Sequence, residues 1–111
     1  MRTYELSVST AIEQRLNSLG DTEDDVALAL WISGRKGRRS DAHSCPIAVD
    51  LKALAGAAQV EITVSDCVEV KDTAVSGGYD QVSLPDAVRD FIIRFDNLDG
   101  GESAYPELEA A

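Results

Sequence analysis

Four cations stand within five positions of one short segment: Arg35, Lys36, Arg38 and Arg39. Such a cluster can contact phosphates by displacing condensed counterions. No aromatic residue is interleaved for base stacking, however, and the chain around the cluster is strongly acidic. Arg and Lys after a helix also interact favourably with its last carbonyls. The sequence therefore favours a structural role, with a protein-contact patch and a nucleic-acid contact as alternatives.

Cys45 is the candidate reactive thiol. A cysteine at a helix N-terminus beside cations has its thiolate favoured, and His43, two residues earlier, could act as its base. No third group can be assigned to orient that histidine, and cysteine is also a common small buried residue. A structural role is favoured, and a cysteine-dependent enzyme built on Cys45 is the alternative.

Metal and phosphate sites find little support. The spacing of His43, Cys45 and Cys67 matches no zinc pattern. Gly77 and Gly78 lack the further glycines and the lysine of a phosphate-binding loop. We therefore expect no metal and no cofactor.

The charge is large and uneven. The formal net charge is −10, and residues 61–111 carry three Lys/Arg against twelve Asp/Glu, whereas residues 1–60 carry seven against eight. An acidic surface repels nucleic acids and anionic membranes but suits basic partners, including nucleic-acid enzymes. Nucleic-acid binding is therefore a poor expectation, and mimicry of nucleic acid is conceivable.

Nothing in the chain resembles a membrane span or a signal peptide. We therefore expect a cytoplasmic protein with no membrane partner. In that compartment the two cysteines are expected to be free thiols.

Apolar residues recur at helical spacing in three N-terminal segments. The pattern predicts helices over about residues 8–19, from Glu23 to about Gly34, and over 46–55, where Pro46 suits the first helical position and Ser44 or Cys45 would cap. The second helix is apolar almost all round, so it is either central to the core or keeps a face for a partner. Trp31 and Ile32 are expected in the core, with an exposed anchor as the alternative.

The spacing of the apolar residues then changes from a period of 3.6 residues to a period of 2, which predicts two strands around residues 60–71. A loop of three residues, Ser65 to Cys67, places Val64 opposite Val68 and so keeps both apolar rows on one side of the sheet. We expect Asp66 or Cys67 to adopt a positive φ there. Gly77 and Gly78 predict a tight turn into a third strand.

A last helix is predicted from Pro85 to about Asn97. The fold class is thus α+β: three N-terminal helices, a three-stranded antiparallel meander, a C-terminal helix and an acidic flexible tail. Residues 1–98 form the single domain. Residues 99–111 form the tail, which only Tyr105 and Leu108 could dock.

Several segments together resemble known proteins. The helix ending in Gly, the basic turn, "CPIA", the short meander, "LPDAVRDFIIRFD" and "AYPEL" resemble a group of small uncharacterised proteins encoded by actinobacteria and their bacteriophages. The resemblance spans about Thr22 to Leu108. It implies no catalytic residues, and it implies a phage accessory gene whose product acts on a host protein.

The leading hypothesis is therefore a small acidic, non-enzymatic interaction protein, a phage-encoded effector that binds and modulates a host protein. Trp31 and the four cations Arg35, Lys36, Arg38 and Arg39 are its candidate contact residues. The alternatives are a nucleic-acid mimic that inhibits a nucleic-acid-binding enzyme and an enzyme that uses Cys45 with His43.

Overall fold

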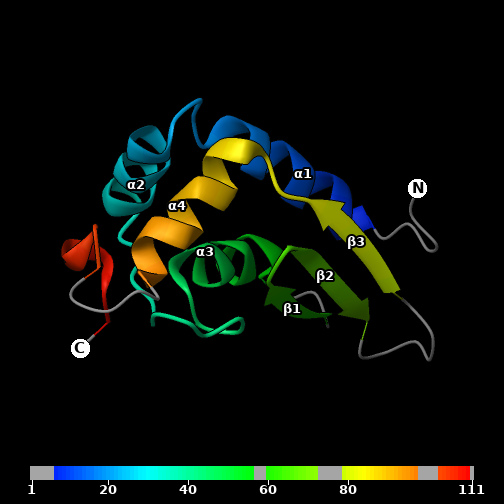
Figure 1. Ribbon diagram of the computed structural model, residues 1–111. Coiled ribbons are helices and arrows are strands. Elements are labelled where there is room, and N and C mark those ends of the chain that lie inside the picture. Colours follow the sequence, from blue (N-terminus) through cyan, green and yellow to red (C-terminus); the bar gives the residue numbers. More distant parts are fainter. Residues whose placement is uncertain (1–6, 57–59, 73–78, 98–102, 111) are drawn as a thin grey trace.

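The computed structural model describes residues 7–56, 60–72, 79–97 and 103–110. Four α-helices and three strands follow one another in the predicted order, and a short 3₁₀ helix, η1, ends the described chain (Figure 1). The elements are α1 (Ser7–Ser18), α2 (Glu23–Ile32), α3 (Pro46–Ala55), β1 (Val60–Val64), β2 (Cys67–Asp72), β3 (Tyr79–Ser83), α4 (Asp86–Asp96) and η1 (Pro106–Leu108). The α+β class and the order of elements are confirmed.

The sheet is an antiparallel meander in the order β1-β2-β3. Val64 lies opposite Val68, as the three-residue loop requires, and both side chains are buried. The expected positive φ at Asp66 or Cys67 is wrong: among the described non-glycine residues, only Ser40 and Asn97 have one. The Ser65 N–H donates to the Cys67 carbonyl instead, and this bond closes the turn without a left-handed residue. The glycine turn at residues 77–78 lies outside the described residues.

Local capping determines where two of the helices begin. The Thr22 hydroxyl accepts a hydrogen bond from the Asp25 N–H at the start of α2. The first turn of α2 contains Glu23, Asp24 and Asp25, whose negative charges are stabilised by the positive end of the helix dipole. Cys45 is the cap of α3, with Pro46 at its first position. These short-range signals explain why both starts could be predicted.

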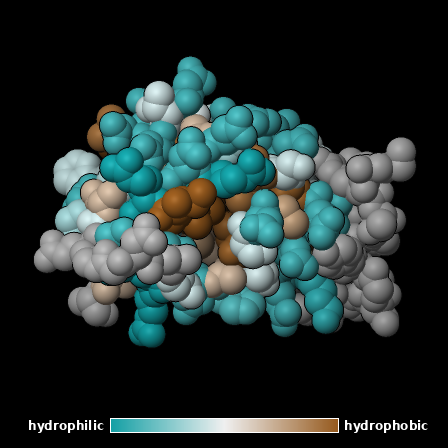
Figure 2. Space-filling model, viewed as in Figure 1, coloured by the Kyte–Doolittle hydropathy of each residue, from teal (hydrophilic) through white to brown (hydrophobic). Residues whose placement is uncertain are grey.

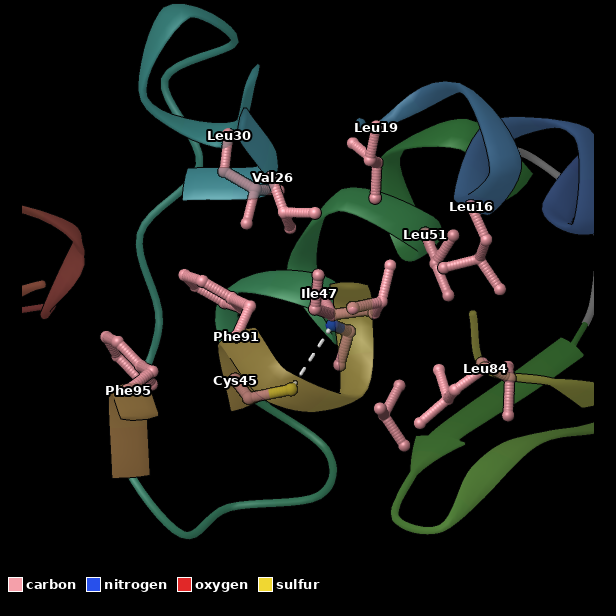
Figure 3. Close-up of a cluster of buried hydrophobic side chains, with 14 of the residues drawn as sticks. Leu16, Leu19, Val26, Leu30, Cys45, Ile47, Leu51, Leu84, Phe91 and Phe95 are labelled. Carbon is pink, nitrogen blue, oxygen red and sulfur yellow. Dashed lines mark hydrogen bonds between the residues drawn. The ribbon is translucent and has the colours of Figure 1, made fainter. Parts of the chain in front are cut away.

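One continuous core joins the sheet to the helices. The strands pack against α1 and α3, and α4 packs against α2 on the side of the molecule away from β3 (Figure 1). Phe91 of α4 lies between the α2 side chains Val26 and Leu30 and the helix cap Cys45 (Figure 3), and its ring stacks on that of Phe95 with the centroids 5.7 Å apart. α2 lies at the end of the molecule remote from the sheet (Figure 1), and its main packing partners among the described elements are α4, η1 and α3.

A buried carboxylate ties three segments together. The Asp50 side chain on α3 is 2% exposed, and its two oxygens accept from Arg15 Nε and Nη2 of α1, both at 2.9 Å, and from Arg35 Nε at 3.0 Å. Arg15 Nη2 also donates to the Ser33 hydroxyl at the end of α2. A buried charge is tolerated only when it is paired and hydrogen-bonded, which is the state of Asp50.

Replacing Asp50 is expected to destabilise the fold. In Asp50→Asn one acceptor oxygen becomes an amide NH₂ that faces a guanidinium donor, and the remaining oxygen is uncharged, so charge-assisted hydrogen bonds are lost. Because both arginines are partly exposed and can regain water, we expect a loss of about 2 kcal/mol in the free energy of unfolding, measured by urea denaturation. Asp90→Asn, on the exposed face of α4, is the matched control and should change this free energy by less than about 0.5 kcal/mol. An unchanged midpoint for Asp50→Asn would contradict this account of the core.

Candidate functional site

The four cations of the basic segment have separate tasks. Arg35 binds Asp50. Arg39 donates from Nε and Nη2 to the Asp96 carbonyl at 3.0 and 2.7 Å and from Nη2 to the Asn97 carbonyl at 3.1 Å. The expectation that the cations would serve the helix before them is therefore wrong for Arg39, because it binds the last carbonyls of α4. Only Lys36 and Arg38 of the four have exposed side chains.

The backbone of the basic segment holds the C-terminal tail. The Gly37 N–H donates to the Leu108 carbonyl, and the Gly37 carbonyl accepts from the Ala110 N–H, which makes a parallel bridge. A Cβ on Gly37 would lie 2.3 Å from the Ser44 carbonyl oxygen, so this close approach of backbone segments requires glycine.

The prediction that Tyr105 and Leu108 could dock the tail is confirmed. Leu108 is fully buried and Tyr105 is 8% exposed. The Tyr105 ring lies 5.2 Å from that of Phe91, and its hydroxyl donates to Asp24 Oδ1 at 2.8 Å. Residues 103–110 are thus packed on the domain beside α2, although the sequence predicts a flexible tail.

Cys45 is a structural cap of α3. Its side chain is 3% exposed and lies within the core (Figure 3), where Sγ accepts from the Ala48 N–H at 3.4 Å. Burial raises the pKa of the Cys45 thiol, and the bonds from the backbone N–H groups only partly offset this. A reactive cysteine needs the opposite environment, with a lowered pKa and access.

His43 does not form a site with Cys45 in the described contacts. Its side chain is exposed, its N–H donates to Asp41 Oδ1, and its carbonyl accepts from Lys52 Nζ. Neither of these contacts brings His43 to Cys45. No cluster of three or more His, Cys, Asp or Glu side chains that could hold a metal occurs among the described residues.

The exposed face of α2 is the main unexplained surface feature. Leu28, Trp31 and Ile32 are 56%, 58% and 71% exposed, while the opposite face of the same helix is buried through Val26 and Leu30. The expectation that Trp31 and Ile32 belong to the core is therefore wrong. α2 sits at the end of the domain, so its neighbours cover only one of its faces. We call Leu28, Trp31 and Ile32 the α2 face.

A groove adjoins the α2 face. It has a volume of about 300 Å³ and lies between α2 and the docked tail. Its walls mix apolar, aromatic and acidic side chains: Asp24, Ala27, Leu28, Trp31, Tyr105 and Glu107. The groove could not be predicted from the sequence, because residues 103–110 reach α2 only through tertiary contacts such as that of Tyr105 with Asp24. The spacing of Leu28, Trp31 and Ile32 at i, i+3 and i+4 was the only signal that could have marked the face.

A second hollow lies beside α4. Brown residues gather there at the centre of Figure 2, and Ile92, Ile93 and Val64 contribute its apolar lining. Asp41, Asp66, Asp96 and Arg89 stand around it. Cys45 also lines this hollow but is nearly inaccessible, so the hollow offers no exposed nucleophile from that residue.

Comparisons with protein-family models, curated proteins and solved structures find no significant match to this chain. Among the described residues, no helix is long and apolar enough to cross a membrane.

The two thiols should react slowly at neutral pH. Burial raises the pKa of Cys67 as well, and Glu69 and Asp66 add to the shift. In the folded protein we expect Cys67, which is half-buried, to react with a disulfide reagent before Cys45, which should react only after denaturation. Cys67→Ser and Cys45→Ser are the matched variants that isolate each thiol.

The sign of the pH dependence follows from the raised pKa of Cys45. The folded protein holds the thiol proton more tightly than the unfolded chain, so this contribution to stability is present below the ordinary thiol pKa of about 8.5 and is lost as the pH rises above it. Rapid, complete modification of Cys45 in folded Cys67→Ser protein at pH 7 would contradict the expected slow reaction of the buried thiol. It would favour the cysteine-dependent enzyme instead.

Proposed function

We propose that this protein is a non-enzymatic interaction protein that binds another protein through the α2 face. The observation that carries the proposal is the exposure of Leu28, Trp31 and Ile32 on one side of one helix. Scattered exposed apolar residues are normal, whereas adjacent ones indicate an interaction site. Three of the five large hydrophobic side chains exposed in the described chain lie here.

The composition of the face fits protein recognition. Tryptophan is enriched among the few residues that carry most of the binding energy, because its large ring loses little conformational freedom when buried. Trp31 and Ile32 follow Leu28 by three and four residues, so both are neighbours of Leu28 on the surface of α2 and all three can enter one interface together. The opposite side of α2 is locked into the core, so the face is presented on a rigid element.

The basic segment takes a smaller part in this proposal than its charge predicts. Arg35 and Arg39 are engaged within the domain, so only Lys36 and Arg38 can offer their charge to a partner. We therefore place the centre of the interface on Trp31 rather than on the cations.

The resemblance to proteins of actinobacteria and their bacteriophages supports a partner in the host cytoplasm. We propose a phage-encoded effector that binds and modulates a host protein. Mimicry of nucleic acid is the competing function, and the net charge of −10 is what favours it. Binding through carboxylates would weaken steeply with salt, whereas binding through the α2 face would persist.

A salt-stepped capture experiment distinguishes the two functions. Immobilised wild type, Trp31→Ala and Leu54→Ala proteins are exposed to nuclease-treated actinobacterial lysate, and bound proteins are eluted with rising salt. Leu54, 43% exposed on α3, is the matched control because its removal also deletes exposed apolar surface. We expect one protein to be held into high salt by wild type and Leu54→Ala and to be lost from Trp31→Ala, since truncating a hot-spot residue costs about 2 kcal/mol or more.

Two outcomes would overturn the proposal. Retention of the same proteins by Trp31→Ala would show that the α2 face is not the contact. Elution of many nucleic-acid enzymes at modest salt, equally from all three proteins, would support mimicry by the acidic surface instead.

A further inference from the structure

The groove beside the α2 face has the chemistry of a receptor for a cationic side chain. We propose, resting on the proposed function, that it takes an arginine or lysine side chain from the partner, on a segment whose neighbouring apolar residues cover the α2 face. The occupant is therefore a basic, amphipathic segment of a protein.

The charge of the groove favours a cation. Two of its six lining residues, Asp24 and Glu107, are carboxylates, and no Lys or Arg lines it in the described chain. The Arg94 side chain of α4 is directed to Glu23, with Nη1 3.5 Å from Oε1. The net charge of −10 adds a long-range attraction for basic partners.

The groove is preorganised by the core beneath it. The Tyr105 hydroxyl donates a hydrogen bond to Oδ1 of Asp24 and so fixes this carboxylate. Tyr105 is itself held in place, because its ring packs on Phe91 and its backbone N–H donates to Ser103 Oγ. A fixed carboxylate loses little freedom on binding, which raises the affinity for a ligand that matches it. Glu107 lies in η1, on the other side of the groove, so an entering cation meets carboxylates from two segments.

The remaining walls suit the rest of such a side chain. Ala27 and Leu28 offer an apolar surface for the methylene stem, as long cationic side chains require. Trp31 supplies the aromatic ring that attracts a guanidinium or ammonium group. A volume of about 300 Å³ is at the lower end of the range of about 300–1,000 Å³ for ligand pockets, and so favours one side chain over a larger ligand.

The groove also joins the α2 face directly, because Leu28 and Trp31 belong to both. A partner segment that places a cation in the groove therefore brings its neighbouring residues onto Trp31 and Ile32. An isolated small cation would leave this face uncovered, which is why we assign the groove to a protein segment.

The test uses the whole protein and a random peptide library. Peptides are selected on immobilised wild type and counter-selected on Trp31→Ala, so that only ligands of the α2 face remain. We expect the survivors to share an Arg or Lys next to apolar residues. Replacing that Arg by citrulline, which keeps the shape and removes the charge, should weaken binding about tenfold.

Variants of the two groove carboxylates test whether the cation of the peptide binds in the groove. Glu107→Gln removes an exposed carboxylate, and Asp24→Asn retains an oxygen that can accept from Tyr105, so neither change should disturb the fold. Each should weaken the basic peptides about tenfold. Asp90→Asn, an exposed carboxylate on α4 outside the groove, should leave the affinity unchanged.

The two proposals fail in different ways. Peptides that depend on Trp31 but carry no basic residue, or that bind Glu107→Gln and Asp24→Asn as tightly as wild type, would overturn the cation receptor and leave the α2 face as a binding surface. A library that yields no peptide dependent on Trp31 would overturn both.

Discussion

The carboxylate of Asp50 is the constraint on which the candidate interface depends. It stands on α3 inside the core and needs the guanidinium groups of Arg15 and Arg35 to compensate its charge. Holding Arg35 fixes the start of the basic segment, and two residues later Gly37 forms the bridge to the tail. The tail then carries Tyr105 to α2 and builds one wall of the groove.

The position of α2 explains why an apolar helix keeps a free face. The sheet packs against α1 and α3, whereas α2 packs mainly on α4, at the end of the molecule remote from the sheet (Figure 1). One side of α2 completes the core through Val26 and Leu30, and the other side is exposed. In this position α2 places the acidic residues of the groove beside the apolar residues of the α2 face. Burial of the apolar residues would supply affinity, and the carboxylates would select a basic partner.

Patterns of short range were enough to predict the elements and the strand register. Val64 and Val68 must face the same side of the sheet, and this requirement determined the length of the loop between them. Thr22 and Cys45 marked the starts of two helices. The exposure of Trp31 could not be predicted in this way, because an all-round apolar helix fits both a central and a terminal position. The partners of Arg39 and Tyr105 are 57 and 81 residues away in the sequence, beyond the reach of any local pattern.

The central claim is that the α2 face is open and acidic at its edge, and quenching of tryptophan fluorescence tests it most directly. Trp31 is the only tryptophan, so the whole signal reports on this face. Relative to the quenching of free N-acetyltryptophanamide by the same reagent, we expect ready quenching by neutral acrylamide and by caesium ions, with iodide much weaker because carboxylates repel it. The difference between the two ions should shrink in Glu107→Gln protein and at high salt. A tryptophan shielded from acrylamide, or quenched by both ions in the same proportion to free N-acetyltryptophanamide, would contradict the account.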